Sequence, residues 1–226
     1  MRKCAILLVL AMLFCMLPVP APAAPVWDLL DCDLTADYQQ SMKVVQGNAG
    51  TVTQQEGYVN ISKTDAEPAE TDNQGAYVWL VPNAMPQLPA DGVFTAEASM
   101  RVAGATTYRA GQFSVRLENR LYPVFLSYEG WIATTSGGGT NKVELDTTVW
   151  HDYALSIDHT SERYDVYVDG VLTIEDAEPQ SYSGGALLRL GADNDARTNL
   201  DVRSVRVGTG DLYSDCLLYT SPSPRD

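Results

Sequence analysis

Histidine is scarce in this chain, which limits the chemistry that it can support. There are only two, His151 and His159, and both lie in or beside a segment with the alternation of a β-hairpin. The sequence also lacks the Gly-x-Ser-x-Gly elbow of many serine hydrolases. Two histidines with no cysteine at ligand spacing do not form a zinc motif. The sequence therefore supports neither a histidine-based metal centre nor a serine–histidine hydrolase.

Cysteine is equally limited. Cys4 and Cys15 fall in the apolar N-terminal segment, and Cys216 falls in the last eleven residues, so Cys32 stands alone between them. A single cysteine cannot form an internal disulfide, which excludes a disulfide-stabilised scaffold. We expect Cys32 to be a small buried residue of an early strand.

Positive charge is also in short supply. The chain has 15 Lys and Arg against 29 Asp and Glu, a net charge of −14. Such a surface repels phosphate backbones, so we expect no nucleic-acid partner. Polyanionic glycans are disfavoured for the same reason, unless a cation or a local basic cluster intervenes.

No apolar run is long enough for a comfortable membrane span. Residues 5–17 form a run of signal-peptide length behind Arg2 and Lys3, and Ala21-Pro22-Ala23 fits a small-x-small cleavage pattern. We predict a signal peptide over 1–23, a protein that is secreted or at the cell surface, and no membrane span once the signal is removed. An uncleaved anchor is the alternative.

The last eleven residues, 216–226, read CLLYTSPSPRD. They resemble the translation of an adapter from a transposon-based sequencing library, and a Ser/Pro-rich linker is the alternative. We treat this segment as a non-native tail. Residues 24–215 then have a length that suits one domain.

Alternation with period two dominates that domain. Phe94, Ala96 and Ala98 share one face of a segment that continues to Val102, and segments 112–118 and 122–128 repeat the pattern. Short strands with Gly, Asn and Asp turns, and no amphipathic helix, indicate an all-β antiparallel sandwich. Near the C-terminus Val202 and Val205 fall on opposite faces, which a β-bulge would explain.

Residues 150–170, WHDYALSIDHTSERYDVYVDG, carry a family resemblance. They read as two alternating strands, the second ending in an Asp-Gly turn. A Trp-x-x-Tyr strand before Tyr-x-Val-Tyr-Val-Asp-Gly resembles the hairpin of laminin-G-like and concanavalin A-like domains. The resemblance implies a two-sheet antiparallel jelly-roll sandwich, with Trp150 packed in the core.

Enzymes with this fold carry catalytic motifs that this sequence mostly lacks. Jelly-roll glycoside hydrolases carry a Glu-x-Asp-x-x-Glu strand, because a retaining mechanism needs two carboxylates about 5 Å apart. That motif is absent. Alginate-lyase-like relatives use Arg, Gln, His and Tyr, and both histidines here lie in or beside the hairpin, away from a front-face cleft. We predict no catalytic residues, with a glycan-cleaving enzyme acting through Glu97 or Glu118 as the alternative.

Carbohydrate recognition requires aromatic rings that stack on sugars and planar polar groups for their hydroxyls. If residues 95–101 and 112–118 line one concave sheet, they bring polar side chains together beside an aromatic platform. Whether Trp131 is exposed or part of the core stays open. The predicted binding residues are Glu97, Arg101, Arg116, Tyr128 and Trp131.

A calcium site is a further candidate. Asp193 and Asp195 supply clustered carboxylates in a loop, and calcium prefers such oxygen ligands. An ordinary Asp/Asn turn is the alternative. The sequence therefore predicts a secreted, non-catalytic module whose partner is an extracellular glycan or polysaccharide. A structural or adhesion module that binds protein is the third possibility.

Overall fold

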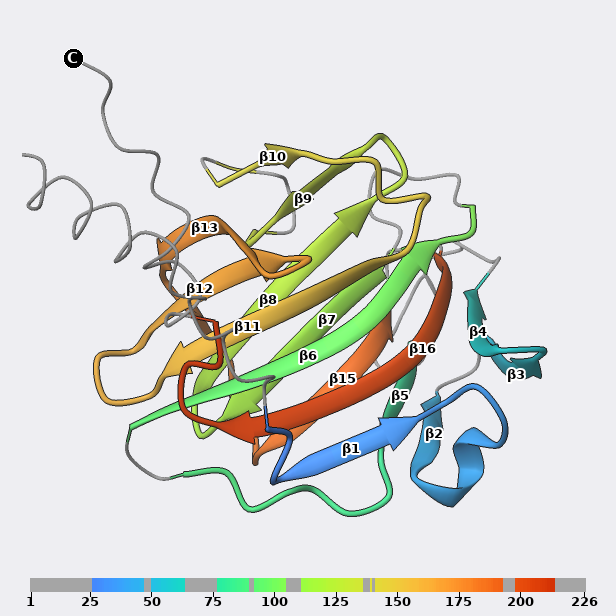
Figure 1. The fold of residues 1–226 in the computed structure, drawn as a ribbon, viewed down its shortest axis with the longest axis horizontal. Helices are drawn as coiled ribbons and strands as arrows, with labels where there is room; N and C mark the ends of the chain where they lie inside the picture. Colours follow the sequence, from blue (N-terminus) through green and yellow to red (C-terminus); the bar gives the residue numbers. More distant parts are fainter. Residues whose placement is uncertain are drawn as a thin grey trace, which may run out of the picture.

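The computed structural model describes residues 26–46, 50–63, 77–89, 92–104, 111–135, 139, 141–192 and 198–213. Two antiparallel sheets of eight strands pack face to face (Figure 1). In the described part of the chain the single helical element is a 3-10 turn, η1 (Tyr38–Gln40). The all-β, two-sheet jelly-roll prediction is confirmed.

Sheet A contains the hairpin that gave the family resemblance. Its strand order is β13 (Val171–Ala177), β12 (Arg163–Val168), β11 (His151–Asp158), β6 (Val93–Val102), β16 (Thr198–Thr209), β4 (Tyr58–Lys63) and β3 (Thr51–Gln55), with β1 (Leu30–Asp33) also paired to β16. The register pairs Tyr153 with Val168, and an Asp169-Gly170 turn with both φ values positive follows β12. The predicted hairpin is confirmed.

Sheet B forms the opposite layer. Its strand order is β10 (Val143–Glu144), β9 (Trp131–Ala133), β8 (Arg120–Ser127), β7 (Gly111–Leu117), β15 (Leu187–Ala192), β5 (Val78–Pro82) and β2 (Met42–Gln46), with β14 (Gln180–Ser181) also paired to β8. β6 and β7 therefore belong to different sheets, and the expectation that residues 95–101 and 112–118 line one sheet is wrong. Alternation identifies the buried face of a strand but not its sheet.

The core lies between the two sheets and is built by the predicted alternation. Phe94, Ala96 and Ala98 of β6 face Phe113 and Val115 of β7, and all five are fully buried. Cys32 is buried in β1, as predicted. None of the helices among the described residues is long and apolar enough to cross a membrane.

A β-bulge occurs where the sequence pattern required one. The register of β16 against β6 shifts between Val202 and Ser204, so Arg203 is the extra residue. Val202 and Val205 are both fully buried because the bulge restores the inward face. Arg203 is exposed, and its guanidinium lies 3.8 Å from the ring centroid of Trp150.

Trp150 is not a core residue, contrary to the expectation. Its ring is half-buried outside the core and contacts both Arg203 and the guanidinium of Arg101, which lies 4.9 Å from the ring centroid. Arg101 is held in turn by Asp201 at 2.9 Å. A tryptophan just before a strand can thus be covered by cation–π contacts instead of by the second sheet.

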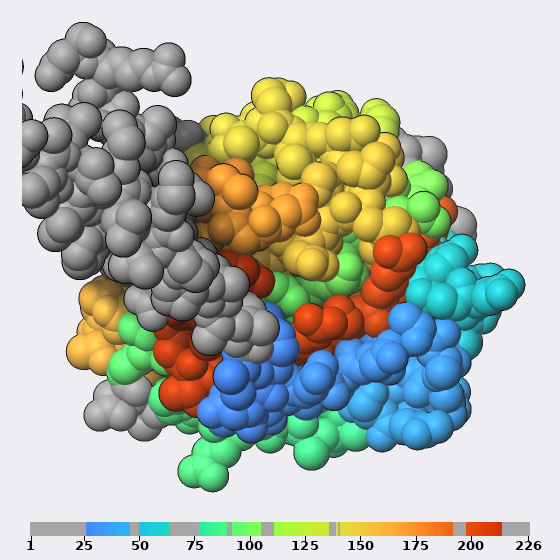
Figure 2. All heavy atoms as spheres, in the orientation of Figure 1, coloured from blue at the N-terminus to red at the C-terminus, as the bar shows by residue number. Residues whose placement is uncertain are grey.

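A second, smaller apolar cluster covers the outer face of sheet A. It joins Ala154, Tyr167 and Tyr213, against which Trp27 and Leu212 pack. The tyrosine rings of this cluster stack with centroids 5.1 Å apart. Figure 2 shows β1 in blue beside β16 in red on this side of the molecule, and their pairing brings the first and last strands together.

Candidate functional site

The outer face of sheet B gathers aromatic and basic side chains. The inward residues of β7 and β15, such as Phe113 and Leu190, belong to the core, so their sequence neighbours point outward. The outward side chains at the centre of the sheet are Trp79 of β5, Arg189 of β15, and Gln112, Ser114 and Arg116 of β7.

Guanidinium and aromatic groups alternate across this face. The guanidinium of Arg189 lies 4.0 Å from the ring centroid of Trp79 and 5.3 Å from that of Tyr182. The guanidinium of Arg116 also lies 5.3 Å from the Tyr182 centroid, and its Nε donates to the Gly185 carbonyl at 2.7 Å. We call Trp79, Arg189, Tyr182 and Arg116 the Arg–aromatic array.

Gly191 allows β15 and β5 to approach closely beside the array. It has a φ of 140°, and a Cβ at this position would lie 2.1 Å from the Val78 carbonyl oxygen. Only glycine fits there without moving backbone. Gly191 pairs with Trp79 and has no side chain. At this position, therefore, no side chain of β15 lies beside Trp79 on the outer face.

The amide of Gln112 is an unsatisfied group of this face. The residue is 3% exposed, and its Nε2 has no hydrogen-bond partner among the described residues. The neighbouring Ser114 is engaged, because its hydroxyl accepts from Arg189 Nε at 3.2 Å. A buried donor without a partner costs about 1–3 kcal/mol, so such groups are rare and call for an explanation.

Trp131 and Tyr128 lie near the far edge of the same sheet. Trp131 is 3% exposed, its Nε1 donates to Glu129 at 3.2 Å, and the Lys142 ammonium lies 5.3 Å from its ring centroid. Of the two interpretations left open for Trp131, burial is the one the structure shows, and the exposed platform is wrong. Tyr128, in the turn before β9, is 41% exposed.

Glu97 and Arg101 lie on the other side of the sandwich. Glu97 is buried on the outer face of sheet A, where it accepts a hydrogen bond from Tyr213 and lies 3.7 Å from Arg206. Burial raises the pKa of the Glu97 carboxyl above its ordinary value. The predicted residues are therefore split between two faces: Arg116, Tyr128 and Trp131 on sheet B, and Glu97 and Arg101 on sheet A.

Several residues of the array escaped the sequence analysis. Trp79 lies in the nearly continuous apolar run 76–81, where no alternation marks one residue as facing outward. Gln112 was detectable as an outward position of an alternating strand, and Arg189 is the only charged residue of β15. Asp193 and Asp195, the predicted calcium ligands, lie outside the described residues.

Neither histidine belongs to a strand of sheet B. His151, in β11, contacts Asp169 through Nδ1 at 2.6 Å and the Asp146 carbonyl through Nε2 at 3.1 Å. His159 follows β11, and its Nδ1 lies 3.3 Å from the hydroxyl of Tyr122, whose ring belongs to the core. The array thus contains groups of the kinds that bind sugars and anions, and neither histidine lies on its sheet.

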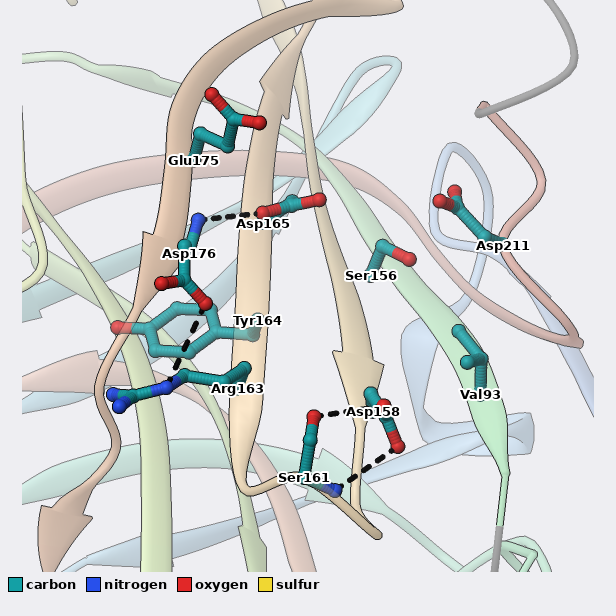
Figure 3. A pocket seen from close by; sticks show the side chains of 10 residues that line it. All are labelled: Val93, Ser156, Asp158, Ser161, Arg163, Tyr164, Asp165, Glu175, Asp176 and Asp211. Atoms are coloured by element: carbon teal, nitrogen blue, oxygen red, sulfur yellow. Dashed lines mark hydrogen bonds and ion pairs between the residues drawn. The ribbon is translucent and has the colours of Figure 1, made fainter.

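A separate pocket of about 620 Å³ opens at the edge of sheet A near β11, β12 and β13 (Figure 3). It is lined by Asp158, Asp165, Glu175, Asp176 and Asp211, among others. Burial raises the pKa of Asp165, whereas hydrogen bonds from Ser161 lower the pKa of Asp158. In the part of the chain that is described, no three carboxylate, histidine or cysteine groups converge as metal ligands would.

Comparisons with known proteins show the fold. No protein-family model and no curated protein matches the chain. The chain is similar to the cellulose-induced protein Cip1 (TM-score 0.52, 10% identity), with 80% of this chain and 97% of that chain covered. It is also similar to a glycosidic hydrolase (0.54, 12% identity), with 84% and 100% covered. A sialidase from Trypanosoma rangeli gives 0.55 and 11% identity, with 84% of this chain and 32% of that chain covered.

Proposed function

We propose that this chain is an exported, non-catalytic carbohydrate-recognition module that binds its glycan on the outer face of sheet B. The observation that carries the proposal is the Arg–aromatic array, which ends in a tyrosine that is 38% exposed, Tyr182. Export rests on the signal-like segment 1–23.

The array has the groups that sugar binding needs. The ring of Tyr182 supplies a surface for the C–H face of a pyranose, and the guanidinium of Arg116 supplies donors in a plane for its hydroxyls. Stacking against Tyr182 limits the rotamers of Arg116, so less entropy is lost when it binds. A shallow contact of this kind gives weak affinity for one sugar, which suits a face that binds a repeating polymer.

The similar structures support the proposal without deciding it. They are a cellulose-induced protein, a glycosidic hydrolase and a sialidase, so this fold occurs among proteins whose names refer to carbohydrates. One fold hosts many functions, however, and the argument has to come from the site. The array provides it.

The positions of the acidic residues favour binding over cleavage. Glu97 lies beneath Tyr213 on sheet A, and Glu118 lies in the exposed turn after β7 with a φ of 48°. The two carboxyls come from different sheets, and neither is an outward residue of a strand in sheet B. We expect no product release from any polysaccharide that the chain binds.

The test is a glycan array and polysaccharide pull-down with the full chain and a Tyr182→Ala variant. We expect binding by the full chain and at least a tenfold loss in the variant. Tyr58→Ala, on sheet A, is the aromatic control and should bind normally. Tyr128→Ala tests whether the predicted edge of the site extends along sheet B.

Three further outcomes would extend or redirect the proposal. A folded chain that binds no glycan but captures an extracellular protein would replace recognition of sugars by an adhesion role. Loss of binding on calcium removal, restored by calcium alone, would support Asp193 and Asp195 as ligands, which stays a prediction. Binding that survives Tyr182→Ala would place the site elsewhere.

A further inference from the structure

We propose that the ligand of this face is an acidic saccharide, one that carries carboxylate groups such as those of uronic acids. The inference rests on the proposed function and narrows its ligand class. It starts from the distribution of charge, because the face that carries the array differs from the rest of this acidic chain.

The outward strand residues of sheet B are nearly free of negative charge. In the strands described, their charged members are Lys43, Arg116, Arg189 and Glu144, and the single carboxylate belongs to the edge strand β10. On sheet A the outward carboxylates include Asp31, Glu97, Asp152, Asp158, Asp165 and Asp201. A chain with a net charge of −14 thus has one face on which an anion is not repelled at close range.

Arg116 is the charged group best placed to bind a carboxylate. Four other arginines, Arg101, Arg120, Arg163 and Arg206, each lie within ion-pair distance of an Asp or Glu. Arg116 has no such pair among the described residues, although it is half-buried and fixed on Tyr182 and Gly185. Its Nε is used by the Gly185 carbonyl, and its terminal nitrogens remain as donors for a carboxylate.

Gln112 points to the same ligand class. Its buried Nε2 is a donor, and it lies on the outward face of β7 with Arg116 four residues further along the strand. Amide and guanidinium nitrogens are donors only, so the ligand that satisfies them is rich in acceptors, and an ionised carboxylate accepts without donating. Four strand residues span about 13 Å, which is longer than one sugar ring, so the face fits an oligosaccharide.

The experiment compares a polyuronate with the same polymer after its carboxyls are methyl-esterified, using the full chain and affinity electrophoresis. We expect the polyuronate to bind at least tenfold more tightly than the ester, and its binding to weaken as NaCl is raised from about 50 to 500 mM. The ester should show little dependence on salt.

Variants locate the effect. Arg116→Gln should lose polyuronate binding, whereas Arg120→Gln makes the same change in net charge at a residue paired with Glu162 and should bind normally. Arg116→Lys keeps the charge without the planar donors and should bind more weakly than the unchanged chain. Gln112→Glu places a carboxylate behind the site and should also reduce binding. Circular dichroism checks that each variant is folded.

The failures are distinguishable. Equal binding of polyuronate and ester, or full binding by folded Arg116→Gln, would overturn the acidic ligand and leave carbohydrate recognition in place. A folded chain that binds neither polymer and no glycan on an array would overturn the proposed function itself.

Discussion

The contact between Glu97 and Tyr213 shows how one buried carboxyl links distant parts of the chain. Glu97 lies in the middle of β6, and Tyr213 follows β16, the last strand. Tyr213 donates to the carboxylate and stacks on Tyr167, so a polar side chain is enclosed by aromatic rings. Burial without full ionic compensation raises the pKa of Glu97, with Arg206 acting in the opposite direction.

This shift predicts a particular pH dependence. A carboxyl with a raised pKa binds its proton more tightly in the folded state, so its contribution to stability is complete at low pH and is lost as pH rises through the raised pKa. Gln cannot titrate but still accepts from Tyr213. We expect the free energy of unfolding of Glu97→Gln, relative to the unchanged chain, to increase from pH 4 to pH 7. Urea unfolding at both values measures it, and an equal difference at both would contradict the assignment.

Single residues were predictable where size and polarity decide their place. Cys32 was expected in an early strand and is buried there. Trp150 was expected in the core and lies outside it, and the position of Trp131 was left open, because a tryptophan can be covered by a sheet, by a lysine or by two arginines. Lys142 lies over Trp131, and Arg101 and Arg203 lie over Trp150. These partners are distant in sequence or depend on a bulge, so no local pattern reveals them.

At the scale of elements, the bulge in β16 decides which residues of the last strand face the core. Val202 precedes it and Val205 and Val207 follow it, and all three are fully buried. One extra residue thus keeps the inward alternation on both sides of the irregularity. The bulge also directs the Arg203 guanidinium onto Trp150.

Replacing Arg203 and deleting it should therefore both leave a folded chain, but they remove different contacts. Arg203→Ala removes an exposed cation–π contact worth about 0.5–1 kcal/mol. Deletion of Arg203 removes the extra residue itself, so Val202 and Val205 become two positions apart and both still face the core in a regular strand. We expect this chain to fold cooperatively, with a somewhat larger loss of stability because the hydrogen bond from Leu34 N–H to the Arg203 carbonyl is also removed. Thermal unfolding followed by circular dichroism compares the two. A deletion variant that fails to unfold cooperatively would show that the fold needs the bulge itself and not only the inward alternation of β16.

Elements could be predicted from the sequence, but their assignment to sheets could not. The alternation of residues 94–102 and 112–118 correctly gives β6 and β7 as strands with one buried face. Both strands bury their apolar residues in the same core, from opposite sides. Nothing in the period-two pattern separates a neighbour in one sheet from a partner in the other, because pairing is decided by long-range contacts. The predicted site was divided for this reason.

The whole molecule has two faces with different roles in packing. The first and last described segments meet on sheet A, where Trp27 and Tyr213 cover the sheet and most outward carboxylates lie. Sheet B carries the Arg–aromatic array. The net charge of −14 suggested a surface that repels anions everywhere. Composition alone cannot show that the acidic residues are concentrated on one sheet. The sequence analysis allowed a polyanionic glycan only if a local basic cluster intervened, and the proposed acidic ligand depends on such a cluster.

The two faces should be separable by mutation. Tyr213→Ala removes a nearly buried aromatic ring and the donor to Glu97, and we expect the free energy of unfolding to fall by about 3 kcal/mol. Tyr213→Phe keeps the ring and should lose less, about 1–2 kcal/mol, because only the donor to the buried carboxyl is removed. Glycan affinity, measured where both variants are folded, should not change, since Tyr213 lies on sheet A. A parallel loss of affinity would mean that the cover of sheet A also shapes the outer face of sheet B through the shared core.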